Sequence, residues 1–227
     1  MVKLLHIDTA LEKAFVGLSR DGVLIGDIEN AVQYDHAAFV QPAIRHILDK
    51  CNFSINDIDA VGITIGPGSY TGLRVGMASA KGICYALNKP LLAVTTLEAM
   101  TFAAIGAFPG FDAYCPMIDA RRDEVYMALY ETAMKPIIAP RAARLPMHFP
   151  ALELQNSKIL FFGTGAAKWK EINAFGPNAS FEQVAYNGKH LAQLLLKSFK
   201  NNLFCDLAYT DPFYIKDFHF AAPRKSS

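Results

Sequence analysis

The sequence predicts an α/β protein made of two duplicated lobes, and three observations lead to this fold class. Apolar runs of strand length alternate with amphipathic runs of helix length along all 227 residues. Residues 7–18 resemble residues 118–129, about half the chain away, because both pass from a strand through an Asp turn into another strand. Residues 65–69 and 162–166 form a second pair, each a glycine turn between a strand and a helix. Two matches in the same order indicate a duplication.

The first half is expected to open with a meander of three strands, because Asp21 and Gly22 form a strong hairpin turn between apolar runs. A helix follows, in which Val40, Ile44 and Ile47 share one face. The elements expected in this half are strands at residues 2–7, 13–19, 22–28, 60–65 and 91–94, and helices at 37–50, 70–87 and from about 96.

The second half repeats the theme, with strands expected at residues 113–119, 124–130 and 158–162 and helices at 165–173 and 188–200. We therefore expect an N-terminal lobe of residues 1–107 and a C-terminal lobe of residues 108–227. The tail, residues 209–227, begins with a short aromatic stretch and is expected to pack back onto the N-terminal lobe.

Composition excludes several classes of protein. The chain is 52% hydrophobic and 19% charged, which suits a folded core, and its net charge of +1 argues against a free-standing nucleic-acid binder. Its four cysteines are scattered without zinc spacing, as is usual in a reducing compartment. Neither a signal-peptide core nor an apolar run of membrane-spanning length is found in the sequence. We expect a cytoplasmic protein.

The glycine turn at residues 66–72 leads into a helix and admits two interpretations. It lacks the Lys and Ser/Thr of a Walker loop, since Leu73 follows Gly72, but a phosphate could bind at the helix start near Ser69. The weak candidates for a nucleotide site are Asp8, Gly66, Gly68, Ser69, Gly163 and Gly165. The interpretation we favour rests on small residues every four positions, at Gly72, Gly76, Ala80 and Cys84, which would let a second helix come close.

The charged residues beside the turns leave further alternatives open. Asp8 and Asp119 each follow a strand and would either hold Mg²⁺ beside a nucleotide or bond the backbone of their own turns. Arg121 and Arg122 are expected to be solvated, and the sequence leaves open whether they or Arg74 contact tRNA. No histidine spacing predicts a metal site, and no serine or cysteine nucleophile signature is present.

Five motifs resemble those of the TsaB (YeaZ-type) family, the dimerisation subunit of the bacterial machinery that makes threonylcarbamoyladenosine in tRNA. They are residues 4–10, 66–74, 80–82, 119–126 and 212–215, so the resemblance spans nearly the whole chain. The chain departs from the family pattern at Ala10, Tyr70 and Ile215–Lys216. The resemblance implies a two-lobed actin-like ATPase (ASKHA) fold, with duplicated ribonuclease-H-like lobes and mixed sheets.

The resemblance also implies a role without catalysis. The paralogue TsaD carries a His-x-x-x-His metal pair and transfers the threonylcarbamoyl group onto the adenosine beside the anticodon. Thr96 and Met100 stand at the matching positions here and are poor ligands for such a metal, so no catalytic metal and no cofactor of its own is expected. The alternative is an actin-like ATPase or small-molecule kinase that uses Asp8 and the turn at residues 66–72.

The partners implied are TsaD and the ATPase TsaE, with a homodimer when TsaD is absent and tRNA contacted only through the complex. Nucleotide would bind weakly or at a partner interface. The helices at 37–50 and 70–87 are the expected docking surface. The residues proposed for it are Val40, Ile44, Ile47, Gly72, Leu73, Gly76, Met77, Ala80, Ile83 and Cys84.

Overall fold

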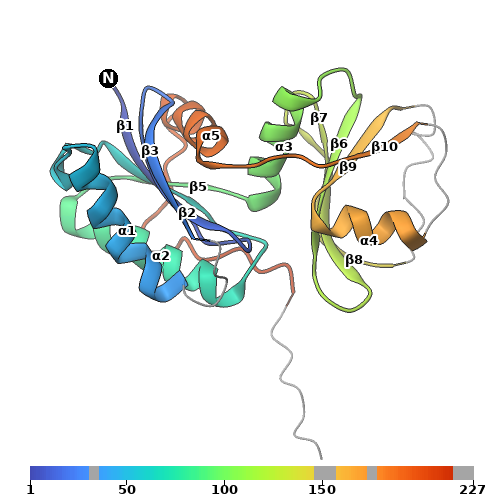
Figure 1. The fold of residues 1–227 in the computed structure, drawn as a ribbon, viewed down its shortest axis with the longest axis horizontal. Coiled ribbons are helices and arrows are strands. Elements are labelled where there is room, and N and C mark those ends of the chain that lie inside the picture. The colour runs from blue at the N-terminus through green and yellow to red at the C-terminus, as the bar shows by residue number, and fades with distance from the viewer. Residues whose placement is uncertain (31–35, 146–156, 173–177, 217–227) are drawn as a thin grey trace, which may run out of the picture.

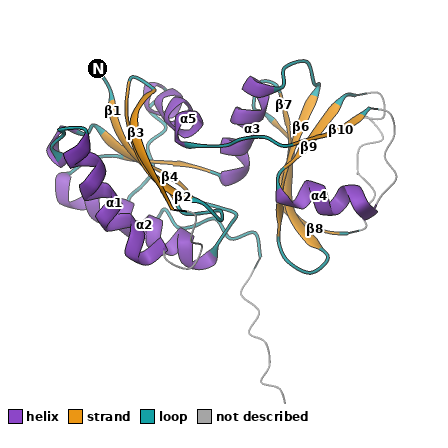
Figure 2. Cartoon of the chain, viewed as in Figure 1, coloured by secondary structure: helices purple, strands orange, loops and turns teal. Residues whose placement is uncertain are grey.

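A computed structural model describes residues 1–30, 36–145, 157–172 and 178–216. Within these ranges the chain forms two five-stranded mixed sheets with helices packed on both (Figure 1). Helix α3 lies between the two sheets (Figure 2). The predicted fold class, α/β with mixed sheets, is confirmed.

The first sheet has the strand order β3-β2-β1-β4-β5. The hairpin strands β1, β2 and β3 are antiparallel, whereas β4 and β5 run parallel to β1. The strand bounds are β1 Lys3–Asp8, β2 Ala14–Arg20, β3 Val23–Asn30, β4 Ala60–Thr64 and β5 Leu91–Val94.

The second sheet repeats this arrangement, with the order β10-β9-β6-β7-β8. Again three consecutive strands form an antiparallel meander, and the last two join in parallel on the side of the first. The bounds are β6 Ala113–Asp119, β7 Glu124–Glu131, β8 Pro136–Arg144, β9 Ile159–Phe162 and β10 Ala179–Glu182. The duplicated topology that the two sequence matches predict is therefore confirmed.

The described helices cover the faces of both sheets. Helices α1 and α2 lie on one face of the first sheet and α5 lies on the other, while α3 and α4 cover opposite faces of the second. None of them is long and apolar enough to cross a membrane. Their bounds are α1 His36–Lys50, α2 Tyr70–Leu87, α3 Thr96–Ala107, α4 Thr164–Ile172 and α5 Gly188–Lys200, with a short 3-10 turn at Ile55–Asp57.

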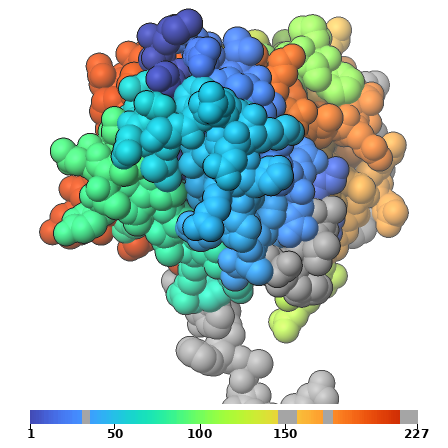
Figure 3. Space-filling view, turned by 60° about the vertical axis from the view of Figure 1, so that its left-hand side comes forward, coloured from blue at the N-terminus to red at the C-terminus, as the bar shows by residue number. Residues whose placement is uncertain are grey.

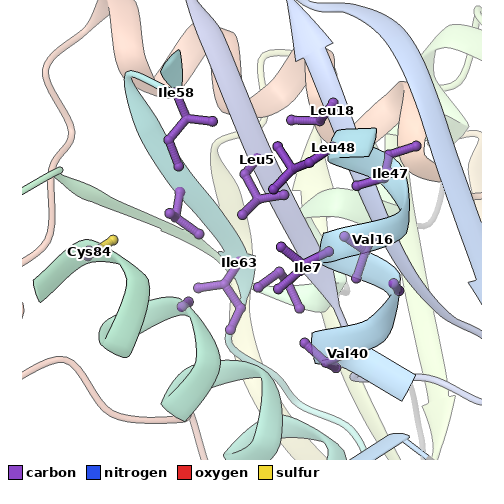
Figure 4. Close-up of a cluster of buried hydrophobic side chains, with 14 of the residues drawn as sticks. Leu5, Ile7, Val16, Leu18, Val40, Ile47, Leu48, Ile58, Ile63 and Cys84 are labelled. Carbon is purple, nitrogen blue, oxygen red and sulfur yellow. The ribbon is translucent and has the colours of Figure 1, made fainter. Parts of the chain in front are cut away.

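The first sheet is buried on both faces because its central strand is apolar on both. Leu5 and Ile7 of β1 pack beneath α1 and α2, as the close-up in Figure 4 shows. Leu4, which points to the opposite face as alternation in a strand requires, packs against Leu191 and Leu195 of α5. Each such side chain contributes about 1.5–3 kcal/mol when fully buried.

Three features differ from the sequence expectation. Strand β8 was not predicted, because its prolines Pro136 and Pro140 suit only a partly exposed edge strand. Strand β10 has only four residues and carries little pattern. Helix α5 packs on the first sheet, although its sequence lies within residues 108–227, which were expected to form the second lobe. Its apolar stripe, which includes Leu191, completes the uncovered face of that sheet.

The segment after α5 returns to the first sheet. Cys205 pairs with Leu91 at the edge strand β5, and the Phe213 backbone N–H donates to the Ile65 carbonyl (2.7 Å). Lys216 then reaches Glu124 of β7 on the second sheet. The rest of the predicted tail, residues 217–227, lies outside the described residues.

Candidate functional site

The Asp8 turn lies at the carboxyl end of β1, the edge where α/β sheets commonly bind ligands. Asp8 is fully buried. Its Oδ1 accepts a hydrogen bond from the Ala10 N–H (2.9 Å), and its Oδ2 accepts one from the Tyr186 hydroxyl (2.6 Å). Burial raises the pKa of the Asp8 carboxyl, and the hydrogen bond from Tyr186 opposes that rise. Both carboxyl oxygens thus have partners inside the chain.

Tyr186 closes this turn from the segment that links β10 to α5. Its ring meets the Phe15 ring edge-on, with centroids 5.8 Å apart. Burial and the neighbouring Asp8 hold the pKa of the Tyr186 phenol well above its ordinary value, so the hydroxyl is the donor in this pair. The sequence analysis missed Tyr186, because the stretch around it carries no motif that would mark it.

The predicted phosphate turn is filled by the chain's own backbone. Gly66 has a φ of +117°, and a Cβ there would lie 2.7 Å from the Phe213 carbonyl oxygen. A Cβ at Gly68 would lie 2.8 Å from the Ala10 carbonyl carbon. Ser69 caps α2 by accepting from the Gly72 N–H (3.3 Å), and its own N–H donates to Ala10. These glycines therefore have a packing reason that the sequence did not reveal.

The equivalent turn of the second sheet is open to solvent. Asp119 is exposed, and its Oδ1 accepts from the Arg121 N–H (2.8 Å) and the Lys168 ammonium (3.0 Å). Arg121 and Arg122 are also exposed, as the sequence predicted, and both have positive φ values.

The two glycines that precede α4 in this lobe pack tightly. A Cβ at Gly165 would lie 2.8 Å from Val125, and one at Gly163 would lie 2.7 Å from the Met100 methyl carbon. Neither glycine leaves an open cradle at this turn.

The face proposed for docking points inward, which corrects the sequence analysis. Nine of the ten residues proposed for the interface are buried in this chain's own core, and only Ile83 is half-buried. In Figure 4, Val40, Ile47 and Cys84 point toward the first sheet. The nine buried residues are Val40, Ile44, Ile47, Gly72, Leu73, Gly76, Met77, Ala80 and Cys84.

The small-residue stripe of α2 has an intramolecular cause. Cβ atoms at Gly72 and Gly76 would collide with the backbone oxygen and the hydroxyl of Thr9. The Thr9 hydroxyl also donates to the Gly72 carbonyl (2.7 Å), so the helix is held directly against the turn that follows β1. Close packing does explain the glycines, but the close neighbour belongs to the same chain.

A second small-residue stripe lies on the outer face of α2. Ala78, Gly82 and Ala86 are all exposed, and a Cβ at Gly82 would meet no atom within 4 Å. Tyr85 beside them is 83% exposed. The four-residue spacing is the signal that identified the inner stripe, so the sequence contained both and could not say which faced outward.

The outer faces of α1 and α2 form one surface, seen in the space-filling view of Figure 3. Between the helices runs an open groove of about 380 Å³, and no side chain that lines it is ionisable. Such a lining suits an apolar segment of another protein better than a charged small molecule. The groove is lined by Gln41, Ile55, Ala78, Ser79, Gly82, Ile83, Ala86 and Leu87.

The residues at the expected metal-pair positions lie inside the protein. Thr96 is fully buried at the start of α3, where its N–H donates to the Gly66 carbonyl (2.8 Å). Met100, one turn later, packs beside Gly163. Among the described residues, no three His, Cys, Asp or Glu side chains gather in a group that could hold a metal ion.

Comparisons with known proteins agree with the fold. Two Pseudomonas aeruginosa structures match over nearly the whole chain. One is described as an uncharacterised protein with similarity to peptidase YeaZ, with a TM-score of 0.83 at 24% identity over 95% of this chain and 100% of that one. The other, described as YeaZ, has a TM-score of 0.76 at 25% identity over 94% and 100%. These likenesses support the two-lobed actin-like fold.

Sequence comparisons identify the family. The family model described as TsaD, tRNA N6-adenosine threonylcarbamoyltransferase, matches residues 29–222. The Bacillus subtilis tRNA threonylcarbamoyladenosine biosynthesis protein TsaB is 30% identical over 74% of this chain and 74% of its own length. The Haemophilus influenzae protein of the same name is 29% identical over 85% and 89%. The chain belongs to the TsaB (YeaZ) family of tRNA threonylcarbamoyladenosine biosynthesis proteins.

Proposed function

We propose that this chain is a non-catalytic subunit in tRNA N6-threonylcarbamoyladenosine formation, docking onto the TsaD transferase and activating it together with TsaE. The docking surface is the outer face of α1 and α2. In the absence of TsaD the same surface pairs two copies of this chain in a homodimer. The modified adenosine lies beside the anticodon, and tRNA is contacted through the complex.

The observation that carries this proposal is the exposed stripe Ala78, Gly82 and Ala86. A glycine inside a helix costs about 1 kcal/mol relative to alanine. At Gly72 and Gly76 contact with Thr9 offsets that cost, but at Gly82 the position of a Cβ is open space. A partner helix seated on the stripe would supply the missing contacts, because small side chains let two backbones approach closely.

The closed Asp8 turn supports a role without chemistry. Both oxygens of Asp8 have internal partners, and the backbone around Gly66 and Gly68 fills the place where a phosphate would lie. Thr96 and Met100, at the positions of the metal pair, offer a hydroxyl and a thioether in place of two imidazoles. We therefore assign no cofactor to the isolated chain.

The test is a substitution that blocks the stripe without touching the core. We expect Gly82→Leu to reduce affinity for purified TsaD at least about tenfold, because a leucine separates the two backbones. The matched control is Gly106→Leu, since Gly106 is an exposed helical glycine on α3 whose Cβ position is equally open. Affinity is measured by titration calorimetry, and modified adenosine in tRNA is scored in the reconstituted reaction.

Equal binding by Gly82→Leu and the unmodified chain would contradict the docking surface. The alternative function, an actin-like ATPase or small-molecule kinase, predicts ATP–Mg²⁺ binding by the isolated chain that is lost in Asp8→Ala. Finding that binding would replace the proposed role.

A further inference from the structure

Arg74 is exposed on α2, one turn before Ala78, and thus begins the row that continues through Gly82 and Ala86. Its guanidinium carbon lies 4.0 Å from the centre of the Tyr70 ring. Its Nε–H donates to the Tyr214 hydroxyl (3.1 Å). The two tyrosine rings lie against each other, with centroids 5.2 Å apart. An exposed arginine ordinarily samples many rotamers, so these two contacts restrict it.

The tail residues that hold Tyr214 are themselves fixed at several points. The Phe213 N–H donates to the Ile65 carbonyl (2.7 Å), and Gly66 leaves room for the Phe213 carbonyl oxygen. Further along α2, Lys81 pairs with Asp211 (3.8 Å) and donates to the Ala208 carbonyl (3.4 Å). The tail segment 208–214 therefore lies along α2 and positions the Tyr214 hydroxyl beside Arg74.

The remaining edge of the Arg74 guanidinium is still able to bind an anion. With Nε used by Tyr214, the two terminal amino groups still form a planar pair that matches a carboxylate or a phosphate. Among the described residues, no Asp or Glu forms an ion pair with Arg74, and the tail carboxylate of Asp211 pairs with Lys81 instead.

The local charge favours a carboxylate over a nucleic acid. Helix α2 carries two cationic side chains, Arg74 and Lys81. Asp211 pairs with Lys81, so on this helix only the charge of Arg74 stays without an acidic partner among the described residues. Binding of a polyphosphate backbone usually draws on many cations at once. One rigid arginine beside an apolar groove resembles a protein interface, where arginines commonly serve as anchors.

We propose that Arg74, held by Tyr70 and Tyr214, is the anchor for a carboxylate side chain of the transferase that docks on α2. Tyr214 of the tail is then part of the docking surface, although it is remote from α2 in sequence. This inference rests on the proposed function, and it adds the chemistry of the partner group and the role of the tail.

The test compares four variants in calorimetric titrations with purified TsaD, at about 50 mM and about 300 mM salt. Arg74→Gln is expected to weaken binding roughly 10- to 100-fold at low salt and to flatten the salt dependence. Arg74→Lys keeps the charge but loses the planar pair, so it should restore only part of the affinity. Tyr214→Phe keeps the ring but loses the hydroxyl, and a loss of roughly threefold to tenfold is expected.

The control is Tyr209→Phe, because Tyr209 is an exposed tyrosine (84%) of the same tail segment, and its hydroxyl forms no hydrogen bond to any described residue. It should bind as the unmodified chain does. If the unmodified chain binds TsaD and Arg74→Gln binds equally well, the anchor is overturned while the docking proposal stands. If Arg74→Gln keeps its affinity for TsaD and loses affinity for tRNA, the group belongs to RNA and the inference is overturned. If the unmodified chain does not bind TsaD at all, the proposed function fails with it.

Discussion

The two sheets share a topology and a turn, but they differ in what surrounds that turn. In both, an aspartate at the end of the central strand accepts a hydrogen bond from the backbone N–H two residues later. In the first lobe this aspartate, Asp8, is fully buried and faces Tyr186. In the second lobe, Asp119 is exposed and pairs with Lys168.

This difference shows that duplication preserved local geometry while burial came to decide the role of each copy. The first turn is held against α2 and the link to α5, and its residues Asp8, Thr9 and Ala10 are buried. The second turn packs against α4, and its charged residues Asp119, Arg121 and Arg122 are exposed to solvent. The same aspartate–backbone hydrogen bond can therefore lie in the core of one lobe and at the surface of the other.

The largest expected effect on stability comes from the tight packing of Gly68 against Ala10. Gly68→Ala places a Cβ 2.8 Å from the Ala10 carbonyl carbon and 3.0 Å from its Cα, so backbone must move. We expect a loss of about 3 kcal/mol or more in the free energy of unfolding. At the equivalent Gly165 the closest atom is a Val125 methyl at 2.8 Å, and Gly165→Ala should lose about 1–2 kcal/mol.

Urea denaturation measures both values. Gly106→Ala is the control, because an exposed helical glycine with open space around it should gain up to about 1 kcal/mol. Equal losses at Gly68 and Gly165 would show that the two turns are equally tight and would remove the contrast drawn between them.

A pH dependence of stability should come from β1 and not from its counterpart β6 at the matching central position. His6 is fully buried, and burial lowers its pKa to about 3; its equivalent in β6 is Met117, which does not titrate. Below pH 6.5 the unfolded chain binds a proton at His6 that the folded chain refuses until about pH 3. The stabilisation linked to neutral His6 is therefore present above pH 6.5 and is lost as the pH falls. At pH 5 the free energy of unfolding is lower by about 2 kcal/mol for this reason.

His6→Met introduces the residue found at the matching position of β6, Met117. It should remove the loss of unfolding free energy that His6 causes as the pH falls. The raised pKa of Asp8 acts in the opposite direction, and comparing the variant with the unmodified chain cancels it. His46→Gln, at an exposed position of α1, is the control. If His6→Met loses stability between pH 6.5 and pH 5 as steeply as the unmodified chain does, His6 is not the source.

Periodicity and turn residues predicted most of the fold. The hairpin at Asp21 and Gly22, the helix ends near Leu87 and Lys200, and the duplication all follow from local signals that the structure reproduces. Edge strands such as β8 escaped prediction, because partial exposure and proline weaken the strand pattern.

The candidate site was harder to predict from the sequence than the fold, because it depends on contacts between segments that lie far apart in the chain. The stripe from Gly72 to Cys84 was correctly seen as a close-packing face, but spacing alone cannot say whether the neighbour is another chain or Thr9. Tyr186 and Tyr214 meet Asp8 and Arg74 across more than half the chain, and neither lies in a motif that chemistry alone would single out.

The smallest effect concerns the partners of the two aspartates. Tyr186→Phe removes the donor to the buried Asp8 carboxyl and should cost about 1–3 kcal/mol, because a buried polar group is left without its hydrogen bond. Lys168→Met removes the partner of Asp119, which solvent can replace, and should cost less than about 0.5 kcal/mol. Both are measured by urea denaturation at neutral pH, with Tyr209→Phe as the control for losing an exposed hydroxyl. Because the turns have the same backbone hydrogen bond, a similar cost for both variants would mean that burial does not distinguish them. A larger loss of unfolding free energy for Tyr186→Phe would show that the burial around the first turn, and not the turn itself, makes its aspartate depend on an internal partner.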